Sequence, residues 1–468
     1  MKLALPDDFS DRLSPMLVKE LRQGLRTKAF IGVFLTLQIV LGVILLGAGT
    51  SSSSDQAGGT ISNIIFVFFA IAVIIIQPMR GMGALSSEIK GNTIDMMVLT
   101  RLSAWRIVTG KWSAIVSQSA LILITIIPYL ILRYFFGGMN LIGEVIFLAL
   151  IFITSATLTA ITVGLSAMPS VILRMLPMIF IPVGAFSFLG EFFDDGQEII
   201  DFCSLETTDD MLAVIIYVAV CLYYSFFLLS IGTTLIAPHA DNNSTSRRLI
   251  AFITTVTAAV LGMIYADNLE DMIAFYFIIL APIFLISLTE FSTLVPPVVN
   301  KFHQYGFFGK LLGLFLLPTW ATGVFFCYLL SVIAGMSLFF VEDSYIDDDA
   351  IIVAMALISS MVFPAILVKI FKMQGPARVS NYILMSAATG IAAIALLGIG
   401  ESLSNKGFLW LFIWIPPVSM AMSASSRIDE EVLMVATGMF NIIYFLIFSS
   451  MAIHHYRKSI NELNHSKS

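Results

Sequence analysis

Two glycine–lysine pairs, Gly110-Lys111 and Gly309-Lys310, come nearest in this sequence to a nucleotide-binding motif. The phosphate-binding loop of a transport ATPase has the pattern G-x-x-x-x-G-K-[ST], in which backbone amides, the lysine and a hydroxyl group hold the phosphates. In both pairs a large apolar residue follows the lysine, and the upstream glycine is missing. We therefore expect no ATP hydrolysis by this chain, so that any nucleotide-driven step requires a separate polypeptide.

Other residue types that could carry chemistry are few and scattered. The three cysteines and five histidines show no zinc-binding spacing, no disulfide framework and no nucleophile motif. The three carboxylates at 347–349 could bind a divalent cation, but a solvated loop is the favoured interpretation. The sequence thus predicts no catalytic residue, no metal site and no cofactor in this chain, which is not expected to be an enzyme.

The composition is that of a membrane protein. Of the 468 residues, 58% are hydrophobic and only 12% are charged, and the mean hydropathy is +0.94. Soluble domains carry about 25% charged residues. Apolar runs of about 20 residues, enough for a helix to cross a bilayer, recur along the whole chain. We expect an all-α, polytopic integral membrane protein; the basic residues form no patch, so nucleic acid is not an expected partner.

The hydropathy pattern predicts about 12 transmembrane helices. They are Ala29–Leu46, Ile61–Met79, Ser113–Tyr134, Leu141–Met168, Val171–Leu189, Met211–Ile236, Leu249–Tyr265, Met272–Val295, Leu311–Phe340, Ala350–Phe371, Tyr382–Gly398 and Val432–Ile453. A further stretch, Phe408–Met422, is short and contains two consecutive prolines, so we expect a re-entrant element. The positive-inside rule then places both termini in the cytosol and the acidic segments 191–210 and 342–349 outside.

Ionisable residues near the predicted spans are scarce. Only Arg133, Glu144 and Glu290 come close, all within about two turns of a span end. An interfacial carboxylate is the favoured interpretation of Glu290, and contact with substrate or with the N-terminal helix is the alternative. This scarcity argues against an ion-coupled secondary transporter, which usually needs charges in the middle of the membrane.

The segment before the first span has the pattern of an interfacial helix. Ser14-Pro15 is a favourable helix start, since proline is tolerated at the first helical position. One face of the following helix is apolar, and the other carries Lys19, Arg22 and Arg26. We expect an amphipathic helix on the cytosolic leaflet within 1–28. An ordinary basic flank of the first span is the alternative.

A polar connector, 80–112, interrupts the first half of the chain. Its five basic residues predict a cytosolic location. Thr93 and Ser103 stand at positions suited to helix caps. Between them lies one apolar helical face, made of Ile94, Met97, Val98 and Leu102. Such a helix, joined to a span, could transmit a push from a soluble partner; the alternative is a loop that only links two spans.

This connector resembles that of the membrane subunits of the ABC type-2 (exporter-type) permease family. The family pattern is Glu, Gly-Thr four and five residues later, a leucine-rich run, Thr-Pro-Leu-Ser and Ile-Val-x-Gly-Lys. The matching residues are Glu88, Thr93, Leu99, Thr100, Leu102, Ser103, Ile107, Val108, Gly110 and Lys111. Asn92 stands where glycine is usual, with Gly91 one residue early, and Arg101 replaces the proline. Both replacements suit a turn or a cap.

The resemblance implies a permease subunit of a bacterial inner (plasma) membrane that exports a lipid-like, glycan or other hydrophobic compound. It implies a separate cytosolic ABC ATPase as partner, alongside membrane lipid, and leaves a second permease copy open. The site at which the ATPase acts would be the connector residues Glu88, Gly91, Thr93, Ile94, Met97, Val98, Thr100, Leu102, Ser103, Gly110 and Lys111. An ATP-independent secondary transporter and a non-transporting membrane scaffold or accessory protein are the alternatives.

The sequence divides into an N-terminal helix (1–28), a first transmembrane half (29–237), a linking hairpin (248–295) and a second, degenerate half (296–468). A weak internal duplication supports the two halves. Four residues before the first span recur at constant spacing before the span of the second half: Pro15, Lys19, Gly24 and Lys28 match Pro297, Lys301, Gly306 and Lys310. The second connector, Lys372–Asn381, is short and lacks the pattern of the first, so we do not expect equivalent halves.

Overall fold

The computed structural model describes residues 15–50, 57–93, 102–134, 140–238, 242–265, 268–291, 294, 296–338, 340, 348–373, 375, 377–402, 406–423 and 430–465. All regular structure in these residues is helical. Twelve of the described helices are long and apolar enough to cross a membrane. The expected fold class is therefore confirmed: this is an all-α, polytopic integral membrane protein.

The chain folds as two compact units, 1–237 and 238–468. Six of the twelve candidate spans lie in each unit. The hairpin predicted at 248–295 belongs to the second unit, where its two helices pack against later helices of the same unit.

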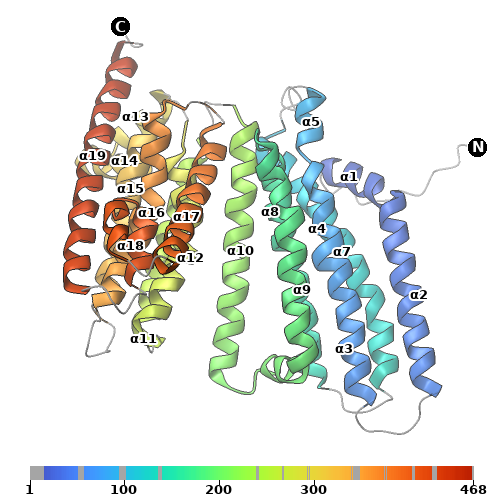
Figure 1. Ribbon diagram of the computed structural model, residues 1–468. Helices are drawn as coiled ribbons and strands as arrows, with labels where there is room; N and C mark the ends of the chain where they lie inside the picture. Colours follow the sequence, from blue (N-terminus) through green and yellow to red (C-terminus); the bar gives the residue numbers. More distant parts are fainter. Residues whose placement is uncertain are drawn as a thin grey trace, which may run out of the picture. The chain divides into compact units, whose positions relative to one another are not determined.

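Unit 1 is a helical bundle with a short helix at one end (Figure 1). Its elements are α1 (Pro15–Leu25), α2 (Lys28–Thr50), α3 (Ala57–Ala70), the π-helix η1 (Ile71–Ile76), α4 (Gln77–Met79), the 3₁₀ helix η2 (Arg80–Gly83), α5 (Ser86–Lys90), α7 (Ala104–Tyr134), α8 (Leu141–Ser166), α9 (Val171–Phe202) and α10 (Thr208–Ile236). α3, η1, α4, η2 and α5 follow one another with little interruption and form a single candidate span.

Local sequence signals explain where several of these helices begin. α1 begins at Pro15, and α2 is a separate helix because Thr27 caps it: its hydroxyl accepts from the Phe30 amide at 3.3 Å. The Asn140 side chain likewise accepts from the amide of Gly143 at the start of α8. Thr207 opens α10 with a capping box that includes Asp210.

Aromatic rings and small residues hold the bundle of unit 1 together. The Phe147 ring stacks on Phe192 at 4.9 Å between centroids and meets Phe66 edge-on at 5.3 Å, which joins α8, α9 and α3. α8 and α10 approach closely at Gly164, where a Cβ atom would lie 2.2 Å from the Leu228 carbonyl oxygen. Close contact at small residues is the usual way in which membrane helices associate.

Unit 2 contains further spans together with several short helices (Figure 1). Its elements are α11 (Ser244–Tyr265), α12 (Leu269–Leu288), α13 (Pro296–His303), α14 (Gly306–Leu316), α15 (Trp320–Leu338), α16 (Asp348–Ile370), α17 (Ala377–Ser402), the 3₁₀ helix η3 (Lys406–Phe412), α18 (Pro416–Ser423) and α19 (Glu430–His465). Buried Ile352, Leu409 and Leu433 form part of a core between α16, η3 and α19.

Three predicted boundaries are wrong. The span expected at Leu311–Phe340 is broken, because α14 ends at Leu316 and α15 begins only at Trp320, with Pro318 between them. α12 ends at Leu288 instead of Val295. α9 continues through the expected acidic loop to Phe202, with one non-helical residue at Asp195.

The stretch Phe408–Met422 contains no helix long enough to cross a membrane. It forms η3 and α18, which meet at Ile415 just before the two prolines. The duplicated residues of the sequence recur in similar elements, since α1 and α13 are both short helices followed by a turn. The helices that follow differ, because α2 has 23 residues and α14 has 11.

Candidate functional site

Three charged side chains of unit 1 meet where α1, α5 and α7 come together. Lys111 Nζ lies 3.0 Å from Glu20 Oε1 and 3.0 Å from Glu88 Oε1. The lysine is buried, whereas the side chains of Glu20 and Glu88 remain 19% and 16% exposed. We call these three residues the Lys111 cluster. One ammonium group, near the end of the connector, thus bonds both to the N-terminal helix and to Glu88 near the start of the connector.

Packing between α1 and α7 places the two carboxylates within reach of the lysine. A Cβ atom on Gly110 would lie 2.9 Å from Met16 Cγ, so the glycine allows α1 to approach α7 closely. Met16 is itself buried, in an apolar cluster with Ile107 and Leu85. Lys111 follows about two turns into α7, where its side chain emerges between α1 and α5.

Arg80 forms a second link between the same elements. Its Nη1 donates to Gln77 Oε1 at 3.0 Å and also to Gln118 Oε1 on α7. Its Nη2 donates to the Gly24 carbonyl at 3.3 Å and to Thr27 Oγ1 at 3.2 Å, both at the end of α1. The end of the second span is therefore tied to the turn between α1 and α2 as well as to α7.

The start of the connector is fixed by Glu88 and Thr93. The Thr93 hydroxyl contacts Glu88 Oε2 and lies 3.2 Å from the Glu88 carbonyl oxygen. Between them, Asn92 adopts φ 53, in the left-handed region that glycine and asparagine tolerate best. Asn92 therefore holds a backbone conformation that a β-branched residue at this position would strain.

A polar cavity of about 360 Å³ lies beside the Lys111 cluster. Its lining includes the charged groups of Glu20, Glu88, Lys111 and Arg80. A cavity of this size with several polar groups can hold water. The two carboxylates can therefore exchange the lysine for water when the surrounding helices move.

The structure brings together the predicted residues at the two ends of the connector. Ser103 caps α7, since its hydroxyl accepts from the Arg106 amide at 3.4 Å, and Leu102 is half-buried beside it. Gly91 ends α5. Lys19 and Arg22 are exposed on α1, and Arg26 is exposed in the turn that follows it. Ile94, Met97, Val98, Thr100 and the helix predicted around them lie outside the described residues.

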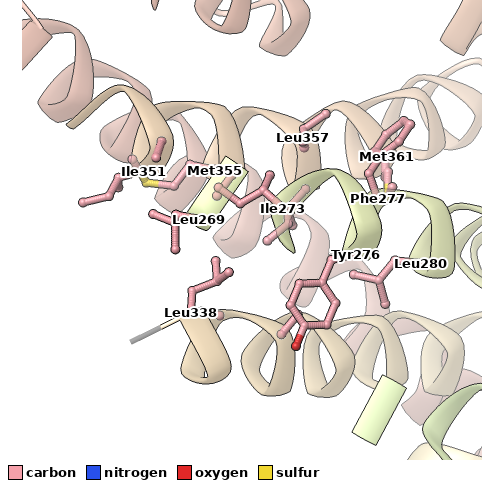
Figure 2. Close-up of a pocket in the computed structure, with 15 residues that line it drawn as sticks. Leu269, Ile273, Tyr276, Phe277, Leu280, Leu338, Ile351, Met355, Leu357 and Met361 are labelled. Atoms are coloured by element: carbon pink, nitrogen blue, oxygen red, sulfur yellow. The ribbon is translucent and has the colours of Figure 1, made fainter. Parts of the chain in front are cut away.

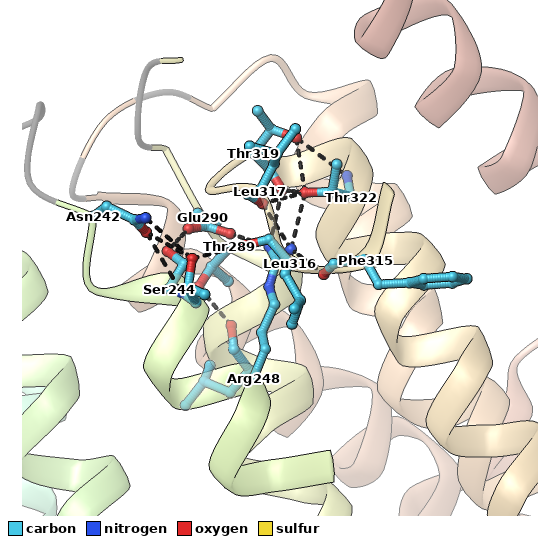
Figure 3. Close-up of polar contacts among 12 residues, drawn as sticks. Asn242, Ser244, Arg248, Thr289, Glu290, Phe315, Leu316, Leu317, Thr319 and Thr322 are labelled. Atoms are coloured by element: carbon cyan, nitrogen blue, oxygen red, sulfur yellow. Dashed lines mark hydrogen bonds and ion pairs between the residues drawn. The ribbon is translucent and has the colours of Figure 1, made fainter. Parts of the chain in front are cut away.

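Unit 2 contains a second charged cluster, which is more deeply buried (Figure 3). Arg248 on α11 pairs with Glu290, just past the end of α12, and Ser244 donates to the same carboxylate. The side chains of Arg248 and Glu290 are only 1% and 4% exposed. We call Arg248, Glu290 and Ser244 the Arg248 cluster.

The guanidinium of Arg248 also bonds to the break between α14 and α15 (Figure 3). Nη1 donates to the carbonyls of Phe315 and Leu317 at 2.7 and 2.8 Å, and Nη2 donates to that of Thr319 at 3.0 Å. The carbonyls at the end of a helix lack intrahelical partners, and a buried carbonyl needs one. Arg248 shares this role with local groups, because the Thr319 carbonyl also accepts from the Gly323 amide, and the Leu317 carbonyl also accepts from the Thr319 amide and the Thr322 hydroxyl.

The favoured interpretation of Glu290 as an interfacial carboxylate is wrong, because the side chain is buried and paired with Arg248. Neither Arg248, Glu20 nor Gln118 was predicted as a site residue. Two arginines before an apolar run are typical of a positive flank, so the sequence offered no reason to place Arg248 inside the fold. The only available signal was the unusual carboxylate close to the end of the following span.

The Lys111 cluster, with its partly exposed carboxylates, is suited to changing its contacts, whereas the buried Arg248 cluster is suited to holding helices together. In the described part of the chain, no group of three or more His, Cys, Asp or Glu residues is arranged to hold a metal ion.

Gly309 and Lys310, the second glycine–lysine pair of the sequence, lie on α14. A Cβ on Gly309 would overlap the Phe302 carbonyl oxygen, so this glycine serves close packing with α13.

Comparison with known proteins adds no relative. No protein-family model, curated protein or solved structure matches the chain.

Proposed function

We propose that this protein is the permease subunit of an ATP-binding-cassette transporter and exports a lipid-like, glycan or other hydrophobic compound. A separate cytosolic ATPase would supply the energy, with both termini of the permease in the cytosol of a bacterial cell. The observation that carries the proposal is the Lys111 cluster. Two residues of the connector pattern, Glu88 and Lys111, are 23 positions apart in the sequence and meet at an ion pair of 3.0 Å.

This ion pair gives the connector a route into the membrane domain. A force on residues 94–101 acts on α5 and α7, the helices on either side of it. Lys111 passes that force to α1 through Glu20, and Arg80 passes it to the turn between α1 and α2. Because the carboxylates are partly accessible to water, the contacts can break and re-form at a modest cost. Such a joint suits a membrane subunit that moves during each cycle of a partner.

The test captures the full chain from its native membrane and measures ATP turnover by proteins that co-purify with it. In the variant M97D/V98D, two charges would lie on the predicted docking face, which costs about 2–7 kcal/mol for each polar group buried without a partner. We expect the ATPase to be lost from the complex or to become insensitive to the permease. The spans should insert normally, because the connector lies outside the apolar runs.

The matched control is R457D/K458D, which adds two carboxylates at exposed positions near the end of α19. It should keep the ATPase and its response to the permease. An M97D/V98D variant that retains a fully responsive ATPase would refute the coupling role of the connector. Capture of the wild-type chain without any ATPase would favour the scaffold or accessory alternative.

A further inference from the structure

A long apolar groove runs along α8 in unit 1. Its lining on α8 begins at Phe147 and ends at Leu165, with residues spaced three or four apart on one helical face. At 1.5 Å per residue, this face is about 27 Å long. α9 and α10 form the other walls, from Leu176 near one end to Cys203 at the other. The groove therefore extends over nearly the thickness of a hydrocarbon core, about 30 Å.

The dimensions of the groove fit a single extended chain. Its volume is about 820 Å³, which is within the range of ligand pockets but small for a length of about 27 Å. Its floor is buried at Phe147, Ile151 and Ile181, whereas Phe180 and Tyr217 on its walls are exposed. A groove that is narrow, apolar and open along one side admits a hydrocarbon chain without requiring an aqueous path.

The polar groups inside the groove are already satisfied. Thr154 donates its hydroxyl proton to the Leu150 carbonyl at 2.7 Å. The 2.6 Å contact between Thr154 Oγ1 and Tyr217 Oη must therefore use the tyrosine proton. Both hydroxyl protons are thus occupied within the protein, and the remaining side-chain donor among the lining residues is the Cys203 thiol, which is a weak one. This chemistry favours a hydrocarbon occupant.

The backbone beside the groove departs from a regular α-helix at η1 and has a proline inside α9. Behind it, Ile74 comes from the π-helix η1, and the Ser155 hydroxyl donates to the Val73 carbonyl at 2.6 Å. Short π-helical segments occur frequently at functional sites. On α9, Pro177 removes a backbone hydrogen bond, and Gly184 leaves space, since a Cβ atom there would meet nothing within 4 Å.

A charged residue, Arg174, precedes the first residues of α9 that line the groove and is not itself one of the lining residues. Arg174 lies one turn before Pro177 on α9, three residues after the helix begins. Its Nε atom is buried and has no hydrogen-bond partner among the described residues. Helical side chains point towards the N-terminus of their helix, so the guanidinium extends beyond the apolar walls. An anionic group at the end of a bound chain would satisfy it.

Another apolar cavity, in unit 2, differs from this groove. It lies between α12, α15 and α16 of unit 2 and has a volume of about 230 Å³ (Figure 2). Its lining on α12 extends only from Leu269 to Leu280, about 17 Å. The hydroxyl of Tyr276 in its wall is bonded to Ser337, and none of the described residues that line it is charged. This cavity offers neither the length nor the charged end of the groove in unit 1.

We propose that the groove between α8, α9 and α10 binds one long, unbranched alkyl chain whose anionic end lies at Arg174. The chain would be longer than an acyl chain of one leaflet, which covers only about half of the hydrocarbon core. The proposal of a binding site depends only on the structure of the groove and of Arg174, and not on the proposed transport function. That the bound lipid is also the exported compound rests on the proposed function.

The test measures binding of tritiated tetracosanoic acid to the purified full chain in detergent, without any ATPase. Dodecanoic acid is the short-chain control, and tetracosanol has the same length without the charge. We expect the long acid to bind at least about tenfold more tightly than the short one, because each additional methylene is buried. Equal binding of the long and short acids would refute the assignment of a long chain.

Two glycines of α9 provide matched variants. Gly184 lines the groove and Gly190 does not, and both are exposed with nothing within 4 Å of an added Cβ. G184F should weaken binding of tetracosanoic acid by about tenfold, since its ring fills the groove. G190F should bind like the wild type. G184L tests the same space with a smaller side chain, and folding is checked by gel filtration. Unchanged binding by both Gly184 variants, or an equal loss in G190F, would overturn the proposal.

The charged end has its own variant. R174Q should weaken binding of tetracosanoic acid and leave binding of tetracosanol unchanged. Unchanged binding of the acid by R174Q would refute the role of Arg174. These measurements use the purified chain without an ATPase. A negative result would therefore refute the alkyl-chain site without bearing on the ATPase coupling. A negative result in the coupling test would not bear on the alkyl-chain site.

Discussion

The Lys111 cluster and the Arg248 cluster use the same kind of ion pair in different surroundings. In the first, the carboxylates of Glu20 and Glu88 remain 19% and 16% exposed beside a polar cavity. In the second, Arg248 and Glu290 are 1% and 4% exposed. A charge pair near water can lose its partner and be hydrated, whereas a buried pair cannot. The comparison indicates that the first joint can move and the second is permanent.

The cations of the two clusters, Lys111 and Arg248, differ in the number and rigidity of their bonds. Lys111 is a compact charge on a flexible chain, and it contacts two carboxylates at single points. Arg248 has a rigid, planar guanidinium that bonds to Glu290, to three backbone carbonyls and to Thr322 at 2.9 Å. An arginine with this many partners fixes the geometry of α11, α12 and the α14–α15 break. A lysine with two partners can change them.

The largest effect should come from removing the carboxylate of the Arg248 cluster. E290L leaves the Arg248 charge buried without its counter-ion, and breaking a buried pair in this way costs about 3–5 kcal/mol. We expect a large fall in the midpoint of thermal unfolding, measured in detergent. K458A provides the control: Lys458 pairs with Glu462 at 4.0 Å on the surface of α19, and both side chains are 69% exposed. That change should cost no more than about 0.5 kcal/mol.

A smaller difference should appear when glycines at the two helix contacts are enlarged. A Cβ on Gly323 would lie 2.3 Å from the Ser287 carbonyl oxygen, and the backbone cannot easily yield. A Cβ on Gly110 would meet the flexible Met16 side chain instead. We expect G323A to destabilise unit 2 by about 1–3 kcal/mol and G110A to cost less. G335A, on the same helix as Gly323 and with open space around it, is the control.

Equal losses in stability for G323A and G110A would contradict the contrast between a rigid and a yielding contact. A loss in G335A as large as that in G323A would show that the effect of G323A does not come from its contact with the Ser287 carbonyl.

The smallest effect on stability should follow from K111M. It removes both ion pairs of the Lys111 cluster, but the carboxylates can turn to water, so the cost should be only about 1–2 kcal/mol. The effect should be local. Amide hydrogen exchange should become faster in α1, which loses its link to α7, and should stay unchanged in α11. Exchange in α1 at the wild-type rate would mean that apolar packing around Met16 alone holds this helix.

Most of the fold could be predicted from the sequence. Long apolar runs must form helices in a membrane because their backbone groups have no other partners, so the number of spans and the fold class follow from hydropathy. Helix starts at Pro15 and Ser103 followed from the chemistry of caps. The single span expected at Leu311–Phe340 was wrong although Pro318 stands at the break, because the carbonyls there bond partly to Arg248, which is far away in the sequence.

The candidate site was predictable only in part, for a reason that applies to both clusters. A pattern of residues identified Glu88, Thr93 and Lys111, because those residues lie in one stretch of sequence. It could not identify Glu20 as the partner of Lys111 or Glu290 as that of Arg248. Those pairs are 91 and 42 positions apart and are brought together by helix packing.

What the sequence determined by itself is therefore local: which segments are helical and apolar, where they start, and which stretch has the pattern of a connector. The tertiary structure decided which charges are paired, how deeply each pair is buried, and where α8, α9 and α10 leave a groove. These properties depend on distances between helices that are remote in the sequence. Hydropathy and caps act within a few turns of one helix, so they carry no information about those distances.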